Sequence, residues 1–231
     1  MTARAPIAVA LDAPDLDTAV AWASSVGEHV SILKVGLETY LRDGSEGVAA
    51  IREAAGPEVD LFLDLKLHDI PNTVAGGARS VAHLSPEILT VHALGGPAMI
   101  KAAADALPDT KIAAVTILTS MSEDDLASTG IQGPARDAVI KLAVMAVNAG
   151  AKALVCSPQE VADVRAAVGP DTLLITPGVR PVGADVGDQQ RIATPEQALA
   201  DGSDLLVIGR PITSADSPGV AAAEIAATLL S

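Results

Sequence analysis

Aromatic side chains are nearly absent from this chain of 231 residues, which has one phenylalanine, one tyrosine and one tryptophan. Proteins that bind single-stranded nucleic acid stack the bases on aromatic rings, and proteins that bind duplexes need a basic surface. Basic residues are also in short supply, because 15 of them stand against 29 acidic residues and the formal net charge is −14. Both shortages argue against a nucleic-acid partner.

Cysteine and long apolar runs are scarce as well. The single cysteine, Cys156, cannot form an internal disulfide, which is typical of proteins from a reducing compartment. No apolar run approaches the roughly 20 residues that cross a bilayer. The apolar stretch Ile7–Leu11 is shorter than the core of a signal peptide, about 7–15 residues. We therefore expect a soluble, cytoplasmic protein with no membrane partner.

What the chain does contain is a regular alternation of two kinds of segment. Short runs rich in leucine and β-branched residues, each bounded by Gly, Pro, Asp or Asn, predict strands. These runs are Ile7–Leu11, Ser31–Val35, Val59–Leu65, Ile88–Val91, Ile112–Leu118, Ala153–Cys156, Leu173–Thr176 and Asp204–Ile208. The segments between and after them predict helices over Asp17–Val26, Glu38–Ala55, Thr73–Val81, Gly96–Leu107, Gly133–Ala149, Pro158–Val168, Pro195–Ala200 and Val220–Leu230.

This alternation predicts an α/β fold, the (β/α)8 TIM barrel, with residues 1–231 forming a single domain. The nearly continuous hydrophobicity of the runs is typical of parallel strands covered on both faces. The alternative is an open doubly wound sheet, which usually has fewer strands and often a glycine-rich fingerprint after the first one. Here the first strand is followed by Asp12-Ala13-Pro14 instead.

Charged residues interrupt the third predicted strand. Alternation places its leucines on the face toward the helices and directs Phe62, Asp64 and Lys66 toward the barrel mouth. Burying a charge costs several kcal/mol unless the charge is paired or used. An internal ion pair between Asp64 and Lys66 is the simplest interpretation of this strand taken alone.

Neighbouring strands carry more charges at the same level. Asp12 ends the first strand, Lys34 lies near the end of the second, and Asp69 lies just beyond the third. Because catalytic residues of barrels lie at the carboxyl ends of the strands, we expect these side chains to meet Asp64 and Lys66 there. Such an alternating array of acids and lysines holds pKa values where proton transfer is useful.

The last two strands indicate an anion site. Arg180 follows strand seven, and Gly209 and Arg210 follow strand eight. Barrels frequently bind phosphate with these two loops and the N-terminus of a short helix, and arginines add forked donors. The alternative is an ion pair with an aspartate of the same region, namely Asp185, Asp188 or Asp216. No spacing of His, Cys and Glu makes a convincing zinc site.

Four motifs together resemble the orotidine 5′-monophosphate decarboxylases of the short bacterial type. They are Leu63–Thr73 (LDLKLHDIPNT), Leu118–Met121 (LTSM), Thr176–Pro181 (TPGVRP) and Val207–Pro211 (VIGRP). The resemblance covers essentially the whole chain, and the D-x-K-x-x-D-I-P-N-T string is highly specific. It implies a decarboxylation of orotidine 5′-monophosphate (OMP) to UMP without metal or other cofactor. This reaction is the last step of de novo pyrimidine nucleotide synthesis, carried out by a homodimer with shared active sites.

The resemblance also implies roles for individual residues. Lys66 would protonate C6 of the pyrimidine, Asp64 would lie beside the departing carboxylate, and Asp69 would reach in from the neighbouring subunit. Asp12 and Lys34 would contact the ribose, and Lys34 would also extend the charge chain. Ile70 and Thr73 would lie beside Asp69, and Thr119 or Ser120 would contact the pyrimidine. The phosphate would be held by Gln189, Gly209 and Arg210, with Arg180 in the same loop system.

Two other functions fit parts of the pattern. A Mg²⁺-dependent sugar-phosphate lyase or decarboxylase on a related barrel can share the D-x-K-x-x-D string, and there the acids would bind the metal ion. A non-catalytic barrel that binds a nucleotide or phosphate would keep the arginine loops but would have no use for Lys66 between two acids.

Overall fold

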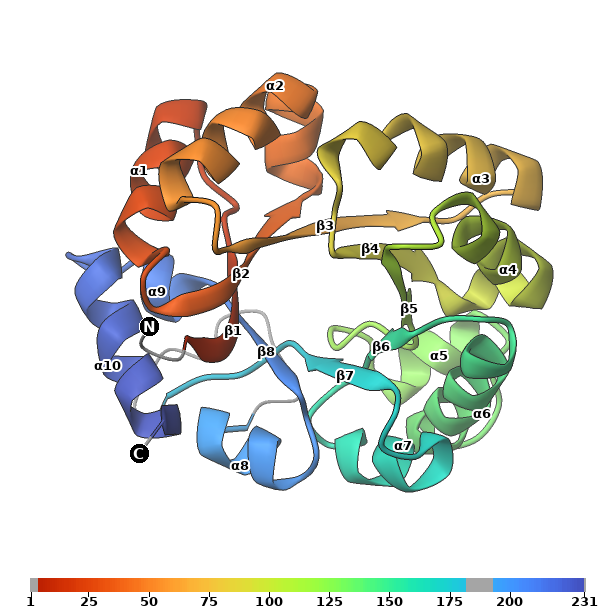
Figure 1. The fold of residues 1–231 in the computed structure, drawn as a ribbon. Coiled ribbons are helices and arrows are strands. Elements are labelled where there is room, and N and C mark those ends of the chain that lie inside the picture. The colour runs from red at the N-terminus through yellow and green to blue at the C-terminus, as the bar shows by residue number, and fades with distance from the viewer. Residues whose placement is uncertain (1–3, 182–192, 231) are drawn as a thin grey trace.

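Eight parallel strands close into a barrel in the order β1 to β8, and helices surround it (Figure 1). The computed structural model describes residues 4–181 and 193–230. The strands are β1 (Ala5–Ala10), β2 (Val30–Gly36), β3 (Asp60–Leu67), β4 (Ile88–His92), β5 (Lys111–Val115), β6 (Ala153–Val155), β7 (Leu173–Thr176) and β8 (Leu205–Ile208). Because β1 pairs with β8, the open doubly wound sheet is excluded and the predicted TIM barrel is confirmed.

Every predicted helix is present. The helices are α1 (Leu16–Val26), α2 (Leu37–Ala55), α3 (Pro71–Ser80), α4 (Gly96–Ala106), α5 (Glu123–Ser128), α6 (Ala135–Asn148), α7 (Val161–Val168), α8 (Pro195–Ala200), α9 (Arg210–Thr213) and α10 (Pro218–Leu230). The short α5, in the loop after β5, was not among the predicted elements, whereas α9 is the short helix expected directly after the eighth strand. Among the described residues, no helix combines the length and the apolar character needed to cross a membrane.

The barrel interior is filled by a layer of apolar side chains, one from each strand. The layer consists of Ala8, Ile32, Phe62, Ile88, Ala113, Ala153, Ile175 and Leu205. Large and small residues share the layer, so the barrel is a packed core and not a pore. Leu61 and Leu63 point the other way and pack among the helices, as the alternation of the third strand predicted.

The pairing of β3 with β4 contains an irregularity. Leu63 is opposite Leu89, but the next aligned pair is Leu67 with Val91. Four residue steps on β3 (67 − 63) therefore match two on β4 (91 − 89), which leaves two extra residues on β3. Lys66 lies in this bulge with a φ of +48°. Bulges bend a strand and redirect its side chains, often next to active sites.

At the opposite end of the barrel, Arg165 of α7 holds the segments that lead into β7 and β8. Its guanidinium donates hydrogen bonds to the backbone carbonyls of Gly169 (2.7 Å), Thr172 (2.9 Å) and Gly202 (3.0 Å). It also forms an ion pair with Asp204. One side chain thus satisfies three carbonyls at the amino ends of two neighbouring strands.

We expect Arg165→Met to lower the free energy of unfolding by about 2 kcal/mol, because hydrogen bonds from a charged donor are lost and carbonyl partners are left unsatisfied. Urea titration followed by circular dichroism measures the free energy of unfolding. Arg136→Met is the matched control, because the Arg136–Asp163 ion pair is exposed and its loss should hardly move the midpoint. Equal losses for the two variants would contradict the role assigned to Arg165.

Candidate active site

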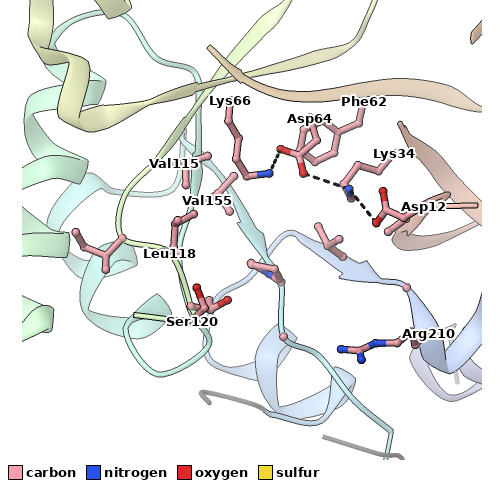
Figure 2. Close-up of a pocket in the computed structure, with 18 of the residues that line it drawn as sticks. Asp12, Lys34, Phe62, Asp64, Lys66, Val115, Leu118, Ser120, Val155 and Arg210 are labelled. Atoms are coloured by element: carbon pink, nitrogen blue, oxygen red, sulfur yellow. Dashed lines mark hydrogen bonds and ion pairs between the residues drawn. The ribbon is translucent and has the colours of Figure 1, made fainter. Parts of the chain in front are cut away.

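Four charged side chains form a row at the carboxyl ends of β1, β2 and β3 (Figure 2). Nζ of Lys66 lies 2.7 Å from Oδ1 of Asp64. Nζ of Lys34 lies 3.2 Å from Oδ2 of Asp64 and 3.9 Å from Oδ2 of Asp12. The structure therefore brings together four of the five charged residues that the sequence placed in one array, with their signs alternating.

The centre of the row is withdrawn from solvent. The side chain of Lys34 is 8% exposed and that of Asp64 is 12% exposed. Burial raises the pKa of Asp64, but the ammonium groups of Lys34 and Lys66 more than offset this, and the pKa lies below its usual value. The carboxylate is thus ionised at neutral pH, and it supplies the partner without which a buried ammonium would be costly.

Gly36, at the end of β2, makes room for the row. It pairs with Asp64 across the β2–β3 ladder. A Cβ at this position would lie 2.6 Å from Oδ1 of Asp12 and 3.2 Å from Nζ of Lys34. Any other residue would therefore displace the Asp12 carboxylate from its place beside Lys34.

The row forms one wall of a cavity of about 530 Å³, a volume suited to a small molecule. Five further predicted residues line the same cavity, from the loops after β5, β7 and β8: Thr119, Ser120, Arg180, Gly209 and Arg210. Figure 2 shows Ser120 and Arg210 lying away from the row. The side chain of Arg180 is largely buried, and its Nη1 donates to the carbonyl of Val179 at 2.9 Å.

One wall of the cavity is apolar and was not predicted from the sequence. It is made by Val115, Ile117, Leu118, Val155, Cys156 and Val207, with Phe62 as part of the floor. Alternation along the fifth, sixth and eighth strands would have found three of these residues. Val115, Val155 and Val207 each lie two positions after an interior residue, namely Ala113, Ala153 or Leu205.

Some predicted site residues lie elsewhere. Asp69, Ile70 and Thr73 are exposed and do not line the cavity of their own chain. Oδ1 of Asp69 accepts a hydrogen bond from the backbone N–H of Ile70 at 2.6 Å, so the structure does not place this carboxylate in the row.

Gln189 lies outside the described residues, and so do Asp185 and Asp188, two of the three alternative partners for the arginines. Among the described residues, no group of three or more His, Cys, Asp and Glu side chains is arranged to hold a metal ion.

The ionic row and two arginines surround one cavity at the carboxyl ends of the strands of a closed parallel barrel. This arrangement is that of a barrel enzyme that acts on a small anionic substrate. Comparison with known proteins narrows this class. The model of the "Orotidine 5'-phosphate decarboxylase / HUMPS family" matches residues 5–225. The chain belongs to this family, which confirms the resemblance seen in its four motifs.

Individual relatives are similar in sequence to this chain along nearly their whole length. The orotidine 5'-phosphate decarboxylase of Thermobifida fusca is 68% identical over 97% of this chain and 96% of its own. That of Anaeromyxobacter sp. (strain K) is 52% identical over 96% and 97%. Among solved structures, orotidine 5'-phosphate decarboxylase from Lactobacillus acidophilus superposes with a TM-score of 0.85 at 36% identity, covering 98% of this chain and all of that one.

The lowered pKa of Asp64 predicts how Asp64→Asn changes stability with pH. Ionised Asp64 stabilises the fold above its unfolded pKa of about 3.9, and this contribution is lost as the pH falls through the lower folded value. The variant should therefore be less stable than the parent protein at pH 7, and the difference should shrink below about pH 4. Urea titrations between pH 7 and pH 3 measure this difference.

Asp60→Asn is the control with the opposite sign. Asp60, at the start of β3, is exposed, and its partial desolvation and then the charge of Glu87 raise its pKa. Its ionised form therefore disfavours folding, and the asparagine variant should be the more stable protein at pH 7. The same sign for both variants would contradict the ionisation states assigned here.

Proposed function

We propose that this protein decarboxylates OMP to UMP, the last step of de novo pyrimidine nucleotide synthesis, with Lys66 as the proton donor. The observation that carries this proposal is the ammonium group of Lys66 in the cavity wall, paired at 2.7 Å with Asp64. Membership of the family and its full-length decarboxylase relatives support the reaction. We also propose a cytoplasmic location, because substrate and product are charged and do not cross a bilayer unaided.

The chemistry requires a cation at one carbon atom. When the bond from C6 to the carboxylate breaks, CO₂ leaves and the electron pair stays on C6 in the plane of the ring, where the π-system cannot delocalise it. A fixed ammonium stabilises this charge as it develops, and a proton then passes from Nζ of Lys66 to C6 to give UMP. Because Lys34 and Lys66 supply positive charge from the chain itself, the reaction needs no metal ion or other cofactor.

The remaining residues have positions that suit the other parts of the substrate. With Nζ of Lys66 at C6, Asp64 lies next to the departing carboxylate, and Lys34 and Asp12 continue the row toward the ribose. Thr119 and Ser120 lie on the cavity wall, where they can contact the pyrimidine. The apolar wall beside them excludes water from the developing carbanion.

The phosphate is assigned to the loops after β7 and β8. Gly209 and Arg210 lead into α9, and Arg180 lies in the neighbouring loop. Backbone N–H groups and guanidinium groups are the donors that proteins use for phosphate. We assign Gln189 to the same phosphate group from the resemblance alone. Because the phosphate is remote from C6, its binding energy can be used to orient the substrate.

The purified protein should lower the absorbance of OMP as it forms UMP, both with and without EDTA. Lys66→Ala should fold normally and lose at least about a thousandfold in kcat, because it lacks both the cation and the proton donor. Lys101→Ala is the control, since Lys101 is exposed on α4 and pairs only with Asp105 among the described contacts. Turnover by folded Lys66→Ala would refute the assigned role, and a strict Mg²⁺ requirement would favour the lyase alternative.

We further propose that the active sites are shared within a homodimer. Asp69 lies outside the cavity of its own chain, where it is available to a neighbour. Large apolar side chains are exposed on the segments that follow three neighbouring strands, β2, β3 and β4, as expected of an interface. They are Leu37, Leu41, Ile70 and Leu94, exposed by 47%, 78%, 67% and 50%. Asp69, Ile70 and Thr73 would together complete the partner's site.

Mixing two inactive variants tests this arrangement. Lys66→Ala and Asp69→Ala subunits, unfolded and refolded together, should pair at random, so about half of the dimers are mixed. Each mixed dimer then holds one doubly altered site and one intact site, and about a quarter of the parental activity should return. If Asp69 acts within its own chain, every site carries one lesion and the activity stays at the level of the single variants.

A further inference from the structure

A buried threonine touches both members of the central ion pair. Thr90 lies in the middle of β4 and is fully buried. Its hydroxyl donates a hydrogen bond to Oδ1 of Asp64 at 3.0 Å. The same hydroxyl oxygen accepts a hydrogen bond from the backbone N–H of Lys66 at 2.9 Å. One hydroxyl group therefore links the carboxylate to the backbone that carries the proton donor.

The backbone at Lys66 needs such a partner. Lys66 and Ser85 are the two non-glycine residues with positive φ among the described residues, and the left-handed region costs a residue with a Cβ about 1 kcal/mol. The bulge interrupts the regular β3–β4 ladder here, and the hydroxyl of Thr90 accepts the hydrogen bond of the Lys66 N–H. Strained backbone of this kind persists only where its surroundings hold it in place.

The carboxylate is held in the same way. Oδ1 of Asp64 accepts hydrogen bonds from Nζ of Lys66 at 2.7 Å and from the hydroxyl of Thr90 at 3.0 Å. Oδ2 of Asp64 is engaged by Lys34 at 3.2 Å. With three donors on two oxygens, the plane of the carboxylate is fixed, and so is the direction from which Lys66 approaches it.

We propose that Thr90 is a positioning residue of the decarboxylation, whose hydroxyl fixes the Asp64 carboxylate and the left-handed backbone of Lys66 so that Nζ is aimed at the reacting carbon. The proposal rests on the function proposed above. Thr90 does not line the cavity, so it acts through its two neighbours and should affect the chemical step more than substrate binding.

Three variants test the proposal. Thr90→Val keeps the shape of the side chain but removes the hydroxyl, and it leaves the N–H of Lys66 without a partner. We expect its kcat to fall by about tenfold to a hundredfold, while KM and the Kd for UMP change by less than about threefold. Thr90→Ser keeps the hydroxyl and should stay within about threefold of the parent kcat.

Thr110→Val is the matched control. Thr110 is also a buried threonine, and its hydroxyl donates at 2.8 Å to the carbonyl of Pro86, at the opposite end of the barrel. This variant should lose thermal stability without losing kcat. If Thr90 had only a structural role, Thr90→Val and Thr110→Val would have the same kcat whenever their losses in Tm are equal.

A double-mutant cycle shows whether Thr90 acts through Asp64. In an Asp64→Asn background, Thr90→Val should lower kcat by a smaller factor than in the parent protein, because one of the two groups that Thr90 positions is already altered, while the N–H of Lys66 still loses its acceptor. Additive effects would overturn the proposal. So would a parental kcat in folded Thr90→Val, or a Thr90→Ser variant as slow as Thr90→Val.

Two further outcomes have defined meanings. If Thr90→Val does not fold, Thr90→Ala replaces it with the same expected loss, and a parental kcat in Thr90→Ala overturns the proposal. If the parent protein does not decarboxylate OMP, the proposed function fails, and the assignment of Thr90 to this reaction fails with it. If the parent protein decarboxylates OMP and Thr90→Val has the same kcat, only the assignment of Thr90 is refuted.

Discussion

The Asp64 carboxylate, held between the ammonium groups of Lys34 and Lys66, is the interaction on which the rest of the site depends. Without the carboxylate, two ammonium groups would face each other in a poorly solvated cavity wall. Without the ammonium groups, burial would favour the neutral acid. The three groups therefore require one another, and their surroundings keep them in contact. Gly36 leaves space beside them, and the β3 bulge directs Lys66 to its partner.

Barrel closure determines how the two halves of the site meet. The ionic row comes from β1 to β3, near the start of the chain, and the arginines come from the loops after β7 and β8, near its end. Because β8 pairs with β1, residues almost 200 positions apart, Asp12 and Arg210 (210 − 12 = 198), line the same cavity. The apolar layer to which Phe62 belongs fills the barrel interior, and Phe62 also lines the cavity.

The fold and the ionic row could be predicted from the sequence because both follow from simple periodicities. Parallel strands are apolar on both faces, so Lys34 and Lys66 stood out in their runs. The bulge could not be predicted, because two extra residues leave the alternation of β3 unchanged on either side. Thr90 is a β-branched residue in a strand, and only the three-dimensional contacts distinguish it from any other. Asp69 lies outside the cavity of its own chain, and its place three residues after Lys66 in the sequence could not show this.

Gly36 has a consequence for the way this protein tolerates mutation. Every missense change at its codon adds a Cβ, and the atoms that this Cβ meets are the tips of the Asp12 and Lys34 side chains, which can move, and not backbone, which cannot. Such alleles should encode a folded protein with a disturbed ionic row. Under the function proposed above, a genetic screen for loss of decarboxylase activity would therefore detect changes at position 36, although glycine offers a substrate no side chain. The property required at position 36 is the absence of a Cβ atom.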